Sequence, residues 1–299
     1  RDSQRVAVEQ LAGQALSRVV NESPKLAARL AYLLGVAQAQ GETAIIVVDA
    51  RSGHVRELPW ELLSLDGSSP PAETIGAATV VRLGEGRMRH ALTSYDRLRV
   101  LLWCAQDDPT SAEVVADLGA IHRSLKIDCL HVDKLNDLPP AAPDVADVLH
   151  IVCHGRRVED TVRLLIADTE QNPTTASHAI AARLHTTALV VLDVCVGGQA
   201  TPHELDNLAS RLVAAGAPAC VAPACKVSAA AATSFSAGLY GSLQAGGSLC
   251  AAISAGRAGV AALAVPHPDS RWYNHLLTVG DLDTVEQVAI VQPRWRPDQ

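Results

Sequence analysis

Apolar residues along this chain fall into two recurring patterns. Between residues 1 and 35 they return every three to four positions, which predicts two helices separated at Pro24, because proline breaks the helical hydrogen-bond ladder. From residue 99 onward, short continuous apolar runs alternate with segments of helical spacing. Such runs are typical of strands buried on both faces of a parallel sheet. The sequence therefore predicts an α/β fold, with a mainly parallel sheet flanked by helices on both faces.

The same patterns predict where each element lies. Strands are expected at 44–49, 77–83, 99–105, 127–132, 148–153, 188–195, 219–224 and 275–279. Further helices are expected at 58–63, 111–126, 204–215, 228–246 and 247–264. A soft boundary near Arg97 separates a smaller N-terminal helical and β portion, 1–96, from a main core, 97–299.

Composition and charge exclude several classes of protein. The net charge of −7 and the lack of a Lys/Arg run argue against direct contact with nucleic acid. No apolar run is long enough to span a membrane, so no membrane association is expected. The seven cysteines are odd in number and form no CxxC pair, which argues against disulfides or a zinc site and favours a reducing cytoplasm. Because the chain begins with Arg rather than Met, we expect a fragment or a processed product.

Two predicted strands end on reactive side chains. The strand at 148–153 is followed by His154, and the strand at 188–195 ends on Cys195. In open α/β sheets, chemistry takes place just beyond the carboxyl ends of the strands. The separation of 195 − 154 = 41 positions leaves room for one crossover, which could bring these strands side by side. A thiol beside an imidazole is the minimum equipment for nucleophilic acyl transfer, so the sequence predicts a cysteine protease.

Several segments occur in an order that is more specific than any one of them. They read LPWELL at 58–63, HIVCHG at 150–155, LLIAD at 164–168, LVVLDVCVG at 189–197, LASRLVAAGAPACVAPA at 208–224 and WYNHLLTVGD at 272–281. In this order and spacing the chain resembles the CHAT family, caspase-like cysteine peptidases related to separase and metacaspases. The resemblance implies a caspase-like sheet and an endopeptidase that cleaves a protein substrate.

The resemblance also implies the roles of individual residues. Cys195 would be the nucleophile, and His154 the general acid and base. The backbone N–H groups of Gly155 and Cys195 would form the oxyanion hole. Families of this fold usually use a dyad without a third acid. No cofactor is expected, since no glycine-rich loop follows the first strand of the alternating region.

Substrate preference is where this chain departs from the family pattern. Asp193 occupies the position where metacaspases carry the carboxylate that receives a basic P1 side chain, the residue before the cleaved bond. Lys226 stands where separase-like members carry an Asp, and Ser228 and Ala229 replace the acidic residues that follow. A basic P1 residue is favoured by Asp193 and an acidic one by Lys226. The sequence leaves Asp193 balanced between a substrate-binding (S1) residue and a structural carboxylate.

Family resemblance further implies a regulatory repeat or sensor protein as partner, and a pore-forming or other effector protein as substrate, in bacterial immunity or programmed cell death. The departures at Lys226, Ser228 and Ala229 keep a catalytically silent interaction scaffold as the alternative. A third hypothesis is a small-molecule-binding doubly wound domain in which Cys195 is incidental.

The remaining conspicuous residues have ordinary interpretations. His150 alternates with the apolar positions of its strand and is interpreted as structural. Trp60 and Trp272 are interpreted as packing anchors, and His178 and His185 as surface residues. The spacing of His203, Cys220 and Cys225 matches no zinc motif, so no metal is expected.

Overall fold

The computed structural model describes thirteen parts of the chain. They are residues 2–49, 58–63, 78–84, 97–104, 109–132, 146–158, 161–166, 169–171, 180, 187–196, 202–223, 227–263 and 275–280. For His154, Gly155 and Cys195 the description covers the backbone. The chain separates into two compact units, Arg1–Arg82 and Leu83–Gln299. The expected boundary at 96/97 stays a prediction, because residues 85–96 lie outside the described parts.

The N-terminal unit is built from two helices, a short 3-10 turn and a strand pair. Its elements are α1 (Asp2–Asn21), α2 (Pro24–Gln40), β1 (Ala44–Val48), η1 (Trp60–Leu62) and β2 (Ala78–Leu83), with β1 parallel to β2. Pro24 opens α2 at a position where its missing N–H costs no hydrogen bond. Gly41 ends the helix at φ 70°, a left-handed conformation that glycine adopts without a Cβ clash. The predicted break at Pro24 is therefore confirmed.

A small core holds the N-terminal unit together. Leu16 and Val20 of α1 are buried against Leu63, which follows η1. Trp60 packs against this cluster, together with Leu30 of α2 and other apolar side chains, as expected of a packing anchor. None of the described helices is long and apolar enough to cross a membrane.

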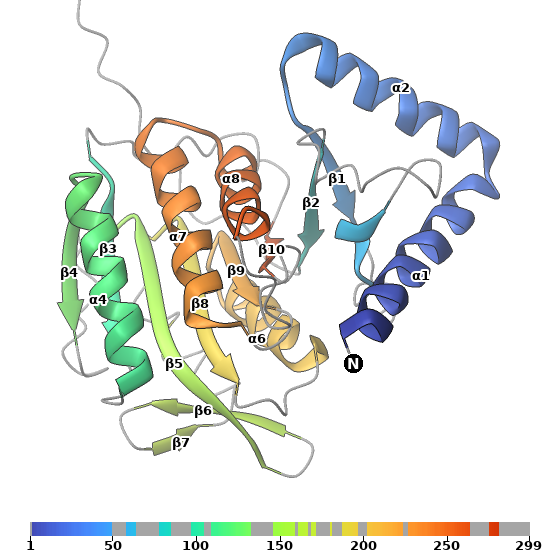
Figure 1. Ribbon diagram of the computed structural model, residues 1–299. Helices are drawn as coiled ribbons and strands as arrows, with labels where there is room; N and C mark the ends of the chain where they lie inside the picture. The colour runs from blue at the N-terminus through green and yellow to red at the C-terminus, as the bar shows by residue number, and fades with distance from the viewer. Residues whose placement is uncertain are drawn as a thin grey trace, which may run out of the picture. The chain divides into compact units, whose positions relative to one another are not determined.

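The main unit contains a mainly parallel sheet (Figure 1). Its strands are β3 (Arg99–Cys104), β4 (Asp128–Val132), β5 (Val148–Val158), β8 (Leu189–Val196), β9 (Ala219–Pro223) and β10 (His275–Val279), in the spatial order β10-β9-β8-β5-β3-β4. Only β10 among these pairs antiparallel with its neighbour, β9. The predicted α/β class, with a mainly parallel sheet, is thus confirmed.

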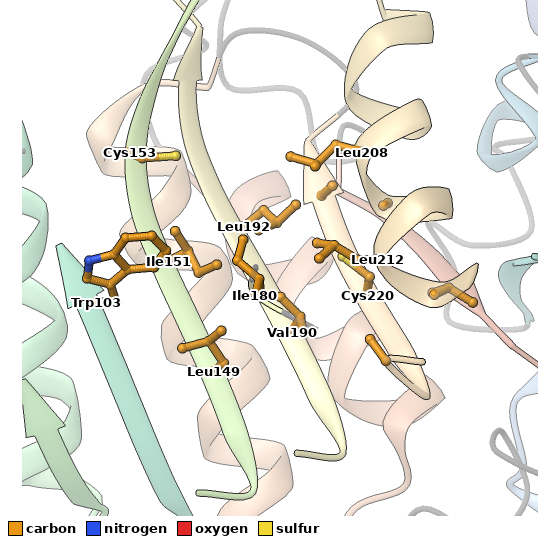
Figure 2. Packing of buried hydrophobic residues seen from close by; sticks show 14 of the residues in the cluster. Trp103, Leu149, Ile151, Cys153, Ile180, Val190, Leu192, Leu208, Leu212 and Cys220 are labelled. Carbon is orange, nitrogen blue, oxygen red and sulfur yellow. The ribbon is translucent and has the colours of Figure 1, made fainter. Parts of the chain in front are cut away.

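Helices cover both faces of this sheet (Figure 1). They are α4 (Pro109–Ser124), α6 (Pro202–Ala214), α7 (Ala229–Gln244) and α8 (Leu249–Ala261). On the α6 face, Leu208 and Leu212 pack in one buried cluster with Leu149, Ile151 and Leu192 of the central strands (Figure 2). Because side chains alternate along a strand, the even positions of β5 and the odd positions of β8 belong to the opposite face, which contacts α7.

β5 is longer than the sequence predicts. The expected strand ended at Cys153, because Gly155 was read as closing it, whereas β5 runs to Val158. The extension pairs antiparallel with β6 (Thr161–Ile166), and β6 pairs with β7 (Thr169–Gln171). Apolar periodicity underestimates the strand because Arg156 and Arg157 belong to this hairpin arm. Position 154 therefore lies within a strand, paired with neighbours on both sides.

Candidate active site

The parallel pairing of β5 with β8 brings the two predicted reactive positions together. Val148 lies opposite Leu189, and the same register places His154 opposite Cys195 and Gly155 opposite Val196. These are the last pairs of the ladder, at the carboxyl end of β8. Such strand ends are where α/β sheets place their ligands. The backbone thus juxtaposes the histidine, glycine and cysteine that the sequence singled out.

The two strands are buried where they lead into this pair. Val152 and Cys153 of β5 and Leu192 of β8 are at most 2% exposed. Their β-branched and leucine side chains fill the sheet faces, which explains why a continuous apolar run precedes each reactive residue. A site near the end of a buried parallel ladder has rigid support, as precise chemistry requires.

Asp193 lies two residues before Cys195, and hydrogen bonds link its side chain to side chains of β5 and α7. Its Oδ2 lies 2.9 Å from Nε2 of His150, and Nδ1 of the same imidazole lies 2.8 Å from the Tyr240 hydroxyl in α7. All three side chains are at most 5% exposed. We refer to Asp193, His150 and Tyr240 as the buried network.

Charges in the buried network follow from its contacts. Burial alone would raise the pKa of the Asp193 carboxyl, but the charge and hydrogen bond of His150, aided by His275, outweigh it and lower that pKa. Burial, and then the negative charge of Asp193, raise the pKa of Tyr240 well above its ordinary value. A carboxylate only accepts, so Nε2 of His150 donates to Asp193. The link between Nδ1 of His150 and the Tyr240 hydroxyl engages the other ring nitrogen, so both nitrogens of this buried imidazole have a partner.

Two further histidines lie on the same face of the sheet. His122 of α4 packs edge-on to the Tyr240 ring, with centroids 4.9 Å apart. His275 of β10 stacks on Phe235 of α7 with centroids 3.8 Å apart. Within the described residues, neither ring has a hydrogen-bond partner for its nitrogens. Burial, followed by the charge of His150, lowers the pKa of His122 to about 4. For His275, burial with Arg257 and His150 outweighs Asp193, and the pKa is again about 4.

Acidification is expected to destabilise the protein through these two histidines. Each takes up a proton below about pH 6.5 when unfolded but only near pH 4 when folded, so stability falls as the pH drops through this window. Between pH 7 and pH 5 each should cost about 2 kcal/mol of unfolding free energy. Urea unfolding of His275→Leu should show a pH dependence reduced by that amount. Thr278→Val is the control, because Thr278 is a buried residue of β10 that does not titrate, and it should keep the wild-type pH dependence of the unfolding free energy. Equal pH dependences in all three proteins would contradict the assignment of this effect to His275.

The remaining predicted residues fall into two groups. Lys226, Cys225, His178, His185 and Trp272 lie outside the described residues, so their roles stay predictions. Ser228, one of the departures from the family pattern, is the N-cap of α7 and accepts a hydrogen bond from the Ala231 N–H. This replacement therefore has a structural role of its own. The described residues contain no cluster of three potential metal ligands.

Sequence reasoning missed the buried network as a unit. His150 was interpreted as structural, but nothing in the sequence tied it to Tyr240, which lies 90 positions away in a helix. The alternation of side chains along a strand is a usable signal, because it places His150 and Asp193 on the same sheet face as positions 154 and 195. His122 and His275 were not singled out at all.

Comparisons with known proteins agree with this architecture. The CHAT domain matches residues 10–274, and the chain belongs to the CHAT domain family. Among solved structures, the Arg-specific cysteine proteinase gingipain R is similar, with a TM-score of 0.50 and 10% identity over 86% of this chain and 67% of that one. The separase–securin complex of Saccharomyces cerevisiae also matches, with a TM-score of 0.48 and 12% identity over 79% of this chain and 15% of that one. No curated protein matches the sequence. The likeness to gingipain R shows that the chain shares the fold of this cysteine proteinase.

Proposed function

We propose that this protein is a cysteine endopeptidase in which Cys195 and His154 form the catalytic dyad. The observation that carries the proposal is the register of β5 and β8, which places positions 154 and 195 directly opposite each other near the end of the parallel ladder that joins the two strands. Membership of the CHAT family supports the same class of chemistry. The alternative, a catalytically silent interaction scaffold, remains the outcome against which the proposal is tested.

In the proposed reaction, the Cys195 thiolate attacks the carbonyl carbon of the scissile peptide bond. The backbone N–H groups of Gly155 and Cys195 stabilise the resulting oxyanion, and a glycine lets substrate approach the backbone closely. His154 protonates the leaving amine as the carbon–nitrogen bond breaks. Water, deprotonated by His154, then hydrolyses the thioester and restores the thiol.

We propose a basic P1 residue. Asp193 lies two positions before Cys195, and its lowered pKa keeps the carboxylate ionised at neutral pH. A buried carboxylate with one oxygen engaged by His150 favours a cationic partner. The competing residue is Lys226, which would favour an acidic P1 side chain. The likeness to gingipain R is a likeness of fold at 10% identity, so the preference rests on Asp193 alone.

Family membership also supports the proposed setting. We propose a regulatory repeat or sensor protein as partner, and a pore-forming or other effector protein as substrate, in bacterial defence or cell death. The cytoplasm is the proposed compartment, because the odd number of cysteines without a CxxC pair suits a reducing environment.

The test is a library of fluorogenic peptides varied at P1, offered to wild type and to Cys195→Ala. Cleavage by wild type alone supports the dyad, and equal cleavage by both overturns it. A preference for Arg or Lys supports Asp193 in the S1 site, whereas one for Asp or Glu assigns that role to Lys226. If both proteins are silent, the alkylation rate of Cys195 by iodoacetamide decides. Rapid alkylation supports an enzyme that awaits its activator, and the slow rate of an ordinary thiol supports the scaffold.

A further inference from the structure

The end of β8 that carries Cys195 is paired with β5 but not, among the described pairs, with β9. The described ladder between β8 and β9 covers Leu189–Val191 opposite Ala219–Val221, whereas the ladder with β5 continues to Val196. Continued in the same register, Asp193 would lie opposite Pro223, which has no N–H to donate. Among the described residues, the last positions of β8 are therefore paired by backbone on the β5 side, and side-chain contacts can add further support.

The buried network supplies that support. Asp193 lies two residues beyond Val191, the last residue of β8 in the described β9 ladder, and its carboxylate is bound by His150 of β5. His150 is in turn bound by Tyr240, which is fully buried in the C-terminal half of α7. The network therefore joins β8, β5 and α7 two positions before Cys195 and four before His154.

Burial makes this connection stiff. His150 and Tyr240 are 0% exposed, so water cannot replace a lost partner. A broken link would leave a polar atom without a hydrogen-bond partner in a low-dielectric interior. This cost favours the one geometry in which both links are formed. The T-shaped contact of His122 with the Tyr240 ring restricts the hydroxyl further.

We infer that His150 and Tyr240 are positioning residues, which hold Asp193 and the adjoining end of β8 in the geometry that places Cys195 against His154. This inference rests on the proposed function for its effect on cleavage, but not for its effect on the strand. It also makes α7 the element through which a change elsewhere in the main unit can reach the site.

The test uses Tyr240→Phe, which removes one hydroxyl and keeps the ring. Because a displacement of about 1 Å at a reacting centre can cost about 10²-fold in rate, we expect kcat to fall by about 10- to 100-fold. KM for a peptide with a basic P1 residue should rise as well, because the network also holds Asp193, the proposed S1 carboxylate. In hydrogen exchange, the amides of residues 193–196 should exchange at least about 10-fold faster, while those of 189–191 remain protected.

A control variant removes a different set of side-chain hydrogen bonds, near the start of β5. Asp147, just before β5, bonds the Arg99 backbone N–H and guanidinium at 2.9 Å each, and it lies seven residues, or roughly 23 Å, before position 154. Asp147→Ala should also lower the melting temperature, but leave kcat and the exchange of residues 193–196 unchanged.

The two readouts separate this inference from the proposed function. If wild type cleaves peptides and Tyr240→Phe matches it in kcat and in exchange, the inference is wrong and the protease proposal stands. If no protein cleaves and the alkylation of Cys195 is that of an ordinary thiol, the protease proposal fails, and exchange alone decides whether the network positions the strand. Equal losses of kcat in Tyr240→Phe and Asp147→Ala would reduce the network to a general contribution to stability.

Discussion

His154→Ala is expected to cleave peptides about 10²- to 10⁴-fold more slowly than wild type, the usual contribution of a positioned general acid and base. The backbone register places this residue directly opposite Cys195, the position from which a general acid could protonate the leaving amine. The loss should appear in kcat, because protonation takes place during bond cleavage and not during binding. Iodoacetamide should also alkylate Cys195 more slowly in the variant, since the thiol loses its base.

Steady-state cleavage and alkylation, measured on the same preparations, check this expectation. His131→Ala is the matched control, because His131 is exposed on β4 at the far side of β3 from β5. It should leave both rates within about twofold of wild type, as expected for a surface change. Retention of full activity by His154→Ala would exclude His154 from the chemistry, whatever happens to Cys195.

Glu61→Ala is expected to lower the free energy of unfolding by about 3–5 kcal/mol, the cost of leaving a buried charge without its partner. Glu61 in η1 and Arg82 in β2 are each 1% exposed. The guanidinium binds both carboxylate oxygens and also donates to the Leu58 carbonyl. Without Glu61, Arg82 keeps its charge, because arginine does not lose its proton in proteins, and water has little access to it.

Urea unfolding followed by tryptophan fluorescence measures this loss, with Trp60 in η1 as a local reporter. Glu113→Ala, a change of the same kind at an exposed site in α4, should alter stability by no more than about 0.5 kcal/mol. A double variant, Glu61→Leu with Arg82→Met, should recover much of the loss, because apolar residues of similar volume need no partner. If Glu61→Ala unfolds at the wild-type urea concentration, the ion pair contributes nothing measurable.

Much of the fold could be predicted because strands buried on both faces leave a clear sequence signal. The runs at 99–105, 148–153, 188–195 and 219–224 each correspond to a strand of the sheet. The apolar pattern alone does not predict the strands β6 and β7, because both are short and mixed in polarity. The local apolar pattern predicts buried strands well. It does not predict a hairpin strand that contains charged residues, such as Arg156 and Arg157.

The two strands of the candidate site could be predicted from the sequence, but the buried network beside it could not. His154 and Cys195 could be placed at neighbouring strand ends from their position after two apolar runs. The pairing of His150 with Asp193 and Tyr240 spans 43 and 90 positions, and no local rule specifies which buried polar groups meet over such distances. Such pairings depend on register and helix packing, which exist only once the sheet has assembled.

The strand order has a consequence for the way the protein is made. Translation delivers β5 before β8 and β8 before β9, yet β8 lies between the other two in the sheet. The strand that carries Cys195 therefore gains its second flanking partner only after residue 223 has left the ribosome. Contacts so distant in sequence form late, because the loops between them must close first. The sheet on both sides of the β8 strand is thus complete only once most of the core exists.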